Sequence, residues 1–427
     1  MKTYTNPEKS DWKDILKRPT KSVDDIEETV LEVFKDIETN GDEAIKRYTE
    51  RFDKVSLDEI IVSQDKIDSA AESVSEELKN AIKLAKSNIE KFHKAQKTEK
   101  IFVETMDGVE CWQEKRPIQK VGLYIPGGTA PLFSTVLMLA VPANIAGCNE
   151  IVLCSPPNSQ GKVANEILYA AQLCGVTKII KVGGIQAVAG LTFGTESIPQ
   201  VYKIFGPGNQ YVTVAKQLAT KFGVAIDMPA GPSELLVMAD ETASAAYVAS
   251  DLLSQAEHGA DSQVIFVTTS NEFAKEVNAE VQKQLNVLPR KDMAFKAIEN
   301  SKSIIVDSFE TALDLIDEYG PEHFIVATKN DDYFVERISN AGSVFIGNYT
   351  PESAGDYASG TNHTLPTNGF SKAYSGVNLD SFQKSMTFQK ISEKGIQNIG
   401  NAIELMAEAE GLQAHKNAVT LRLKDLK

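Results

Sequence analysis

The chain has 427 residues, of which 42% are hydrophobic and 24% are charged. These proportions are typical of a globular protein, and the length predicts about three domains rather than one compact core. Lysine and arginine number 44 against 59 aspartates and glutamates, so the net charge is −15. That charge argues against nucleic acid and anionic membranes as partners and favours small molecules.

The N-terminal segment is polar and leads into no apolar signal-like region. The most apolar stretch, residues 136–146, is interrupted by Pro142 and Asn144 and is too short to cross a bilayer. The four cysteines form no C-x-x-C pair and do not suggest a disulfide framework. We therefore expect a cytoplasmic protein with free, mostly buried thiols.

The first hundred residues carry apolar side chains at helical spacing among many charges, over residues 23–52 and 67–92. This pattern predicts two helices that cover another layer. From Val121 onward, short β-branched runs alternate with helical stretches. The expected strands are residues 121–125, 151–153, 179–182 and 201–204, and the helices between them are residues 133–145, 163–173 and 185–193. Such alternation predicts a parallel sheet with helices on both faces.

A second series of the same kind follows. Its expected strands are residues 235–238, 264–267, 304–306, 324–327 and 344–346, and its expected helices are residues 243–256, 271–285, 310–318 and 332–340. The fold class predicted from the pattern is therefore α/β, with two parallel sheets. Residues 350–375 are poor in apolar side chains and predict a long, functional loop. A helix over residues 391–409 and a short helix carrying His415 complete the chain.

Histidine is scarce, which makes its positions informative. Only five occur, and four lie in the last 170 residues beside acids, glycines or a carboxamide: His258, His323, His363 and His415. Because histidine serves both metal ligation and proton transfer near neutral pH, the four indicate one assembled site. The fifth, His93, lies in a helix among lysines and is expected at the surface.

A metal site is predicted from residue type and spacing. Gln255 and His258 are three apart at the end of a helix and can leave the same face, although a helix that merely ends in polar residues would look similar. Asp356 offers an oxygen ligand or, alternatively, an Asx-turn. His415 could complete the set or be an ordinary surface residue. Two imidazoles, a carboxylate and a carboxamide suit zinc or manganese.

Glu322 and His323 place a carboxylate and an imidazole together at the entry to an apolar strand. Diverging side chains there could serve two proton transfers at one substrate, whereas the alternative is a solvated turn. Glycine-rich turns follow several expected strands, at residues 126–128, 183–184 and 205–209. Such turns allow close approach of a ligand, but the chain contains no G-x-G-x-x-G fingerprint of a dinucleotide site.

Several longer motifs resemble those of the histidinol dehydrogenase family. They are VGLYIPGGTAPLFSTVLMLAVPANIAGC (residues 121–148), FGPGNQYV (205–212), AIDMPAGPSE (225–234), DLLSQAEHGADSQV (251–264), GPEH (320–323), SAGDYASGTNHTLPT (353–367) and EGLQAHKNAVTLRL (410–423). The likeness extends from about Trp12 to the end of the chain. One departure is Ala260, where the family pattern has proline; we expect it to affect helix termination rather than chemistry.

The resemblance implies NAD-dependent oxidation of L-histidinol through L-histidinal to L-histidine, the last two steps of histidine biosynthesis. It implies one zinc per subunit, held by Gln255, His258, Asp356 and His415, which orients the substrate. It also implies that His323 accepts the alcohol proton and that Glu322 activates water. The implied substrate contacts are Ser233, Gln255, His258, His323, Asp356, His363, Glu410 and His415, and the implied NAD contacts are Tyr124, Gln186 and Asn209.

The resemblance further implies two incomplete Rossmann-like domains and a homodimer with shared active sites, in which each tail serves the partner. The expected division is an N-terminal segment (1–22), a first α/β domain with the metal and catalytic residues (23–118 plus 234–372), a second that binds NAD (119–233) and a helical tail (373–427).

Three other functions stay open from the residues alone. A zinc hydrolase would need the same metal and Glu-His pair. A related NAD-dependent dehydrogenase could oxidise another polar alcohol, and a binding module would have no turnover at all. Aldehyde oxidation could also proceed through a thiohemiacetal on Cys111 or Cys154, although both lie in apolar or strand contexts.

Overall fold

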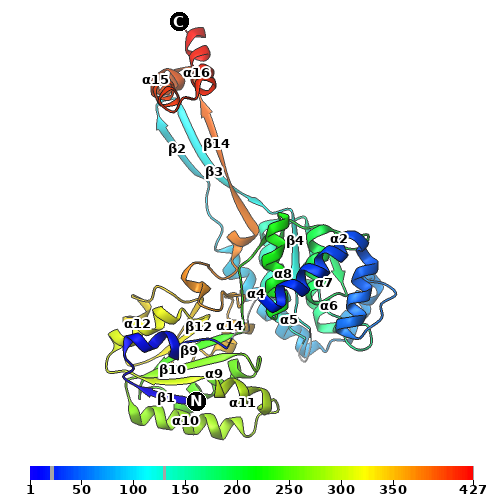
Figure 1. Ribbon diagram of the computed structural model, residues 1–427, viewed down its shortest axis with the longest axis vertical. Helices are drawn as coiled ribbons and strands as arrows, with labels where there is room; N and C mark the ends of the chain where they lie inside the picture. The colour runs from blue at the N-terminus through cyan, green and yellow to red at the C-terminus, as the bar shows by residue number, and fades with distance from the viewer. Residues whose placement is uncertain (20–23, 128–130, 427) are drawn as a thin grey trace. The chain divides into compact units, whose positions relative to one another are not determined.

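The computed structural model describes residues 1–19, 24–127 and 131–426 (Figure 1). The chain divides into two compact units. The first comprises residues 1–96 and 118–382, and the second residues 97–117 and 383–427. The first unit contains two parallel sheets, which confirms the α/β class expected from the sequence. Gly128 of the first glycine-rich turn and Val23 at the start of the first expected helix lie outside the described residues.

A five-stranded parallel sheet occupies the middle of the chain. Its strand order is β6 (Lys178–Ile180), β5 (Glu150–Cys154), β4 (Lys120–Tyr124), β7 (Lys203–Phe205) and β8 (Ala225–Ile226). Its crossover helices are α5 (Phe133–Ala146), α6 (Asn165–Leu173), α7 (Gly184–Phe193) and α8 (Gln210–Ala219). Successive residues of β4 and β5 are buried in cores on opposite faces, so both faces of the sheet are covered, as continuous apolar strands predict.

The N-terminal helices also cover this sheet. Helix α2 (Asp24–Asp53) packs against α7 and α8, while α3 (Gln64–Ser73) and α4 (Glu76–Lys94) pack against α6 and α5. These helices, which the expected division groups with residues 234–372, thus pack against the helices of the five-stranded sheet. An apolar face shows that a helix is buried, not which sheet buries it.

Two further expectations for this region need correction. The single helix expected over residues 67–92 is broken at Val74, and Ser75 caps α4 by accepting a hydrogen bond from the Leu78 amide at 3.3 Å. His93 is fully buried rather than exposed, with Nδ1 2.8 Å from the Ile89 carbonyl oxygen. Burial lowers the pKa of His93, so this ring is a neutral core residue.

The second sheet of the first unit has six parallel strands. Their order is β1 (Lys2–Thr5), β11 (Lys302–Ile305), β10 (Gln263–Thr268), β9 (Glu234–Ala239), β12 (His323–Ala327) and β13 (Ser343–Ile346). One face is covered by α9 (Ala245–Ala256), α10 (Asn271–Leu285) and α11 (Lys291–Glu299), the other by α1 (Trp12–Ile15), α12 (Phe309–Tyr319) and α13 (Asp331–Val335). The sequence predicted the five strands β9 to β13, but it predicted neither β1 nor α11.

The loop expected over residues 350–375 contains a helix, α14 (Glu352–Tyr357), which packs beside α9. Asp356 therefore lies on a helix rather than in an Asx-turn. Among the residues that the structure describes, no helix is both long and apolar enough to cross a membrane.

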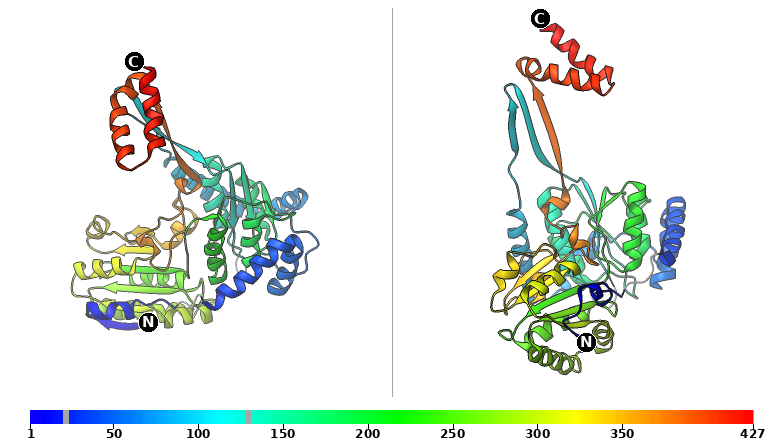
Figure 2. Two further views of the ribbon diagram at one scale, coloured as in Figure 1. Left: turned by 45° about the horizontal axis from the view of Figure 1, so that its top comes forward. Right: turned by 60° about the vertical axis from the view of Figure 1, so that its left-hand side comes forward.

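The second unit is an antiparallel sheet joined to a helix pair (Figure 2). Strand β3 (Val109–Pro117) pairs with β2 (Ile101–Met106) and with β14 (Gln383–Ile391), and Trp112 stacks on Phe388 with ring centroids 5.2 Å apart. Helices α15 (Glu393–Ala409) and α16 (Gln413–Asp425) pack together. Residues 97–117 thus belong with the C-terminal segment, and residues 373–382 belong to the first unit. Both corrections follow from the β3–β14 ladder, which joins segments about 270 residues apart.

Candidate active site

The two sheets of the first unit contribute opposite edges to one small cavity. Its volume is about 230 Å³. Residues 207–210, which follow β7, line one side, and residues 230–233, which precede β9, line another. The predicted site residues Ser233, His258, Glu322 and His363 also line it. The cavity therefore lies at the carboxyl edge of the five-stranded sheet and at the amino edge of the six-stranded sheet.

Glu322 and His323 are both held by the backbone of Glu234, at the start of the neighbouring strand. Glu322 Oε2 accepts a hydrogen bond from the Glu234 amide at 2.8 Å, and His323 Nδ1 lies 3.1 Å from the Glu234 carbonyl oxygen. Because a carbonyl oxygen can only accept, Nδ1 must carry a proton. Nε2 of His323 is buried and has no hydrogen-bond partner. It is thus the ring nitrogen that can gain and lose a proton.

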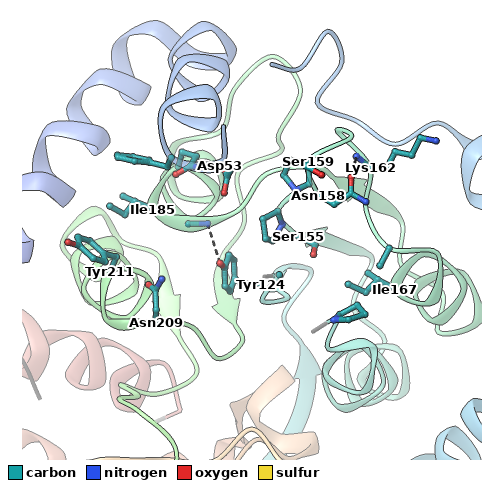
Figure 3. Close-up of a pocket in the computed structure, with 18 of the residues that line it drawn as sticks. Asp53, Tyr124, Ser155, Asn158, Ser159, Lys162, Ile167, Ile185, Asn209 and Tyr211 are labelled. Carbon is teal, nitrogen blue, oxygen red and sulfur yellow. Dashed lines mark hydrogen bonds between the residues drawn. The ribbon is translucent and has the colours of Figure 1, made fainter. Parts of the chain in front are cut away.

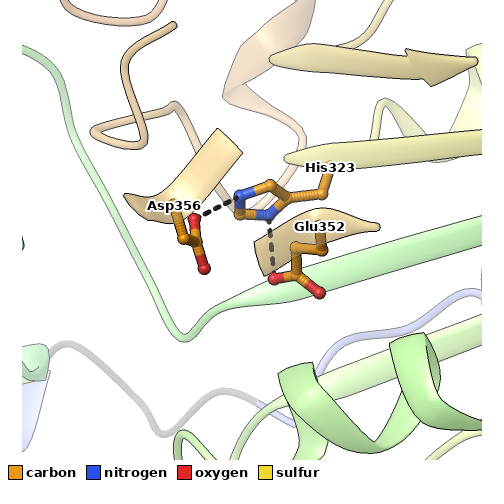
Figure 4. Close-up of side chains that lie close together, drawn as sticks. All are labelled: His323, Glu352 and Asp356. Atoms are coloured by element: carbon orange, nitrogen blue, oxygen red, sulfur yellow. Dashed lines mark ion pairs between the residues drawn. The ribbon is translucent and has the colours of Figure 1, made fainter. Parts of the chain in front are cut away.

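Two further acids surround His323 (Figure 4). Glu352 Oε1 lies 3.8 Å from Nδ1, and Asp356 Oδ1 lies 3.7 Å from Nε2. Burial alone would oppose a charge on the ring, but the carboxylates of Glu322, Glu352 and Asp356 outweigh it and raise the pKa of His323 well above its ordinary value. Burial also raises the pKa of Glu352, whose residue is completely inaccessible. For Asp356, burial is outweighed by the positive charge of the His323 ring, whose Nε2 lies 3.7 Å from Oδ1, and the pKa is lowered.

Glu352 was missed in the sequence. It lies one helical turn before Asp356, so the two share a face of α14, and Ser254 of α9 donates to its Oε2 at 3.2 Å. The segment was expected to be a loop, and the i and i+4 spacing of Glu352 and Asp356 is informative only when the segment is known to be helical. Ligand atoms of His323, Glu352 and Asp356 all lie within 4.8 Å of one another, close enough to share a cation.

Three of the four predicted metal ligands come from two packed helices. Gln255 and His258 leave the end of α9 with Nε2 and Nδ1 3.4 Å apart, and α14 supplies Asp356. The fourth, His415, is exposed on α16 in the second unit, as is Glu410 at the end of α15. Gln255 is fully buried, yet its Oε1 has no hydrogen-bond partner. An orphaned amide oxygen on a residue beside the His258 imidazole, with the Asp356 carboxylate on the neighbouring helix, is a donor set that fits zinc.

The predicted substrate contact His363 is fixed by bonds to both of its ring nitrogens. Nδ1 lies 2.9 Å from the Asp356 carbonyl oxygen, and Nε2 lies 3.0 Å from the Thr135 hydroxyl. Since the carbonyl can only accept, Nδ1 carries the proton and Nε2 accepts from Thr135. Burial lowers the pKa of His363, so it remains neutral despite the nearby Asp356 carboxylate.

A larger cavity of about 940 Å³ opens at the carboxyl edge of the five-stranded sheet (Figure 3). The three predicted NAD contacts, Tyr124, Gln186 and Asn209, all line it. The Tyr124 hydroxyl accepts from the Gly184 amide at 3.2 Å, and Gln186 donates to Asp53 at 3.0 Å. Asp53 comes from the end of α2 and was not identified in the sequence, because nothing local links α2 to this sheet. Burial raises the pKa of its carboxyl group.

The loop at residues 206–209 separates the two cavities, since Asn209 lines both. Gly206 has a φ of 124°, and a side chain there would collide with the Tyr124 carbonyl group. The loop is tied down by a buried ion pair between Lys216 and Asp227. Lys216 Nζ donates to the Gly206 carbonyl and Asp227 Oδ2 accepts from the Gly206 amide, both at 2.8 Å. Glycine is thus required for close packing of the loop on β4.

The thiols of Cys148, Cys154 and Cys174 should be chemically inert at pH 8. Burial raises the pKa of Cys148 and Cys174 to about 12, and it raises the pKa of the fully buried Cys154 as well. At pH 8 only on the order of one such thiol in ten thousand is a thiolate. We expect iodoacetamide to label these three cysteines only after unfolding, or as the pH approaches 12, as mass spectrometry of the digested protein would show.

A thiohemiacetal route has little support from these positions. Cys154 is buried in β5, and Cys111 lies in β3 of the second unit; neither lines either cavity. We expect Cys111→Ser and Cys154→Ser to retain the activity of the unchanged protein. Loss of activity in a folded variant would restore the thiol route.

Comparison with known proteins gives one consistent result. The sequence profile of the family described as histidinol dehydrogenase matches residues 16–423. The histidinol dehydrogenases of Bacteroides thetaiotaomicron and Bacteroides fragilis are 58% and 57% identical to this chain over 427 residues, covering 100% of both chains in each case. The crystal structure of histidinol dehydrogenase from Elizabethkingia anophelis is similar with a TM-score of 0.97 and 56% identity, covering 100% of this chain and 98% of that one.

Proposed function

The chain belongs to the histidinol dehydrogenase family, and we propose that it oxidises L-histidinol through L-histidinal to L-histidine with two NAD⁺ and one zinc. The observation that carries this proposal is the arrangement around Glu234. It keeps a proton on Nδ1 of His323, leaves Nε2 as the nitrogen through which the ring gains or loses a proton, and sets the Glu322 carboxylate 3.6 Å from Nδ1. Glu322 lines the small cavity and His323 is the next residue of the chain, and a base beside a second proton acceptor is what two successive oxidations of one carbon require.

In the first oxidation, the substrate hydroxyl gives its proton to His323 Nε2 while the hydride on the same carbon passes to NAD⁺, leaving the aldehyde. Glu322 then accepts a proton from water, whose oxygen adds to the aldehyde carbon while the aldehyde oxygen takes the proton that His323 holds, which forms the hydrate. The second hydride passes to a second NAD⁺ and leaves the carboxylate. The sum is one alcohol, one water and two NAD⁺ converted to one carboxylate, two NADH and three protons.

Zinc would be held by Gln255, His258 and Asp356 together with His415. The orphaned Oε1 of Gln255 supports this assignment, because a buried amide oxygen without a partner is costly unless something binds it. When bound, zinc supplies a positive centre to which the imidazole and amino nitrogens of the substrate can bind. Ser233, His363 and Glu410 would make the remaining substrate contacts.

The second unit supports a homodimer in which His415 and Glu410 serve a second copy of the chain. Its two helices expose the large apolar side chains of Leu405, Met406, Leu412 and Leu421, at 58%, 66%, 43% and 53% of their surface. So much exposed apolar surface on a small helix pair indicates a face that another surface covers. A tail that packs on the partner would bury these residues and bring His415 to the metal.

The assay of the proposed function is direct. Purified protein incubated with L-histidinol and NAD⁺ should form two NADH for each histidine, and treatment with a strong chelator should abolish the reaction until zinc is restored. An amino alcohol without the imidazole should be a poor substrate. Absence of NADH with zinc bound would rule out the proposal and favour a hydrolase.

NAD⁺ is proposed to bind in the larger cavity through Tyr124, Gln186 and Asn209. Tyr124→Phe removes the acceptor of the Gly184 amide at the start of α7. One lost hydrogen bond should raise the KM for NAD⁺ roughly fivefold while leaving the KM for histidinol unchanged. Tyr202→Phe is the matched control, because Tyr202 is half-exposed and lines neither cavity. An unchanged KM for NAD⁺ in the Tyr124 variant would place the nucleotide elsewhere.

A further inference from the structure

Glu234 joins several parts of the first unit at the start of β9. Its backbone holds both members of the proton-accepting pair, through the bonds to Glu322 Oε2 and His323 Nδ1. Its own side chain is only 3% exposed, and it accepts a hydrogen bond from the amide of Asn368. The adjacent Thr367 accepts from the Gly231 amide, so the loop that lines the small cavity is fixed at the same place.

The buried Glu234 carboxylate is neutralised by a residue from far away in the sequence. Arg18 donates from Nε to Oε1 at 2.7 Å and from Nη2 to Oε2 at 2.8 Å, which is a two-bond clamp. The same Nη2 also donates to the Tyr319 carbonyl at 2.8 Å, and the guanidinium group lies 4.0 Å from the centroid of the Tyr319 ring. The guanidinium is therefore fixed in position and in plane.

The surrounding contacts extend this arrangement to the neighbouring strand. The Tyr319 hydroxyl donates to Oε1 of the Gln263 side chain at 3.0 Å. The backbone amide of Gln263 donates to the Ser233 carbonyl oxygen at 3.2 Å. Ser233 lines the cavity. Arg18 is thus connected to Glu234 directly and to the Ser233 carbonyl through Tyr319 and Gln263, so it reaches both residues of the peptide group whose amide donates to Glu322.

We propose that Arg18 is a positioning residue for Glu322 and His323, acting through Glu234. This inference rests on the proposed function, since it assigns the pair its role in proton transfer. Arg18 lines neither cavity. Its contribution is to fix the rotation of the Glu234 peptide, because a carboxylate left buried without its partner would move toward water and draw the strand end with it.

The first test uses the full-length zinc-loaded protein with Arg18→Ala and Arg18→Lys. We expect Arg18→Ala to lower kcat by on the order of tenfold to a hundredfold, while the KM for NAD⁺ stays within twofold, because nucleotide binds in the other cavity. Arg18→Lys should be intermediate, since an ammonium supplies the charge but not the planar two-bond clamp. Millimolar guanidinium should restore part of the kcat of Arg18→Ala, and sodium chloride at the same concentration should not.

Lys9→Ala is the matched control. Lys9 also comes from the N-terminal segment and forms an ion pair with Asp314 of α12 at 2.9 Å, but both side chains are more than half exposed. This variant should keep the kcat of the unchanged protein. The proposal is overturned if folded Arg18→Ala keeps its kcat within twofold, or if its kcat falls with its thermal midpoint and guanidinium restores neither.

A second readout separates this inference from the proposed function. The chain has only five histidines, so the Nδ1 proton of His323 can be assigned in ¹⁵N-labelled protein by its absence in His323→Ala. Arg18→Ala should shift that signal or broaden it by exchange with water, whereas Lys9→Ala should not. If the unchanged protein forms no NADH from histidinol, the proposed function fails, and the imidazole signal alone decides whether Arg18 positions His323. An unchanged signal in Arg18→Ala would refute the positioning role.

Discussion

Glu322→Gln should convert the enzyme from a four-electron to a two-electron oxidant that stops at the aldehyde. The glutamine amide oxygen can still accept from the Glu234 amide, so the geometry of the cavity is kept. The variant loses the carboxylate that is proposed to accept a proton from water. General-base catalysis of this kind contributes a factor of about a hundred to ten thousand to the rate. We expect one NADH per histidinol in the first phase, and histidinal should be recovered by an aldehyde trap such as semicarbazide.

His323→Ala should impair the other half of the reaction. Without Nε2, no described side chain is left in the same position to take the alcohol proton, so oxidation of histidinol should fall by a similar factor of about a hundred to ten thousand. Histidinal supplied as substrate should be oxidised at a rate closer to that of the unchanged protein. Equal slowing of both substrates in both variants would contradict this division of roles and assign the two residues to one shared step.

Mixing two inactive metal-ligand variants should restore activity. His258→Ala and His415→Ala each remove one proposed zinc ligand, so each alone should lose zinc and turnover, because an open or incomplete site binds metal far more weakly. If His415 serves the partner, a heterodimer places both lesions in one site and leaves the other intact. Random reassociation then gives roughly a quarter of the activity of the unchanged protein.

The zinc content measured by atomic absorption should recover in the same proportion as the activity. Lys416→Ala is a suitable control, because Lys416 neighbours His415 on α16 but pairs with Glu408 at 2.9 Å. It should retain both zinc and activity. Purification through two different affinity tags, one on each variant, would show that heterodimers have formed. If these heterodimers are inactive, His415 acts within its own subunit.

The sequence was most informative where strands are buried on both faces. The continuous apolar runs at residues 121–125 and 264–267 predicted parallel strands; β10 contains the second run, and β4 contains all but the last residue of the first. It failed at β2, β3 and β14, whose residues are mostly exposed or half-buried and whose pairing joins distant segments. It also failed at His93, where flanking lysines indicated solvent although the ring faces the core.

Side-chain periodicity and long motifs are local properties, so the two α/β sheets, the family and the residue types available for chemistry could be predicted from the sequence alone. The position of the small cavity, at the amino edge of the six-stranded sheet where β9 and β12 run side by side, depends on how the strands are ordered and became known only from the fold. The fold also placed Glu352 against His323, Asp53 against Gln186 and Arg18 against Glu234. These partners are separated by 29 to 216 positions in the chain and come together only through the fold. The local sequence also does not predict which backbone carbonyl accepts from a histidine ring and so fixes the position of its proton.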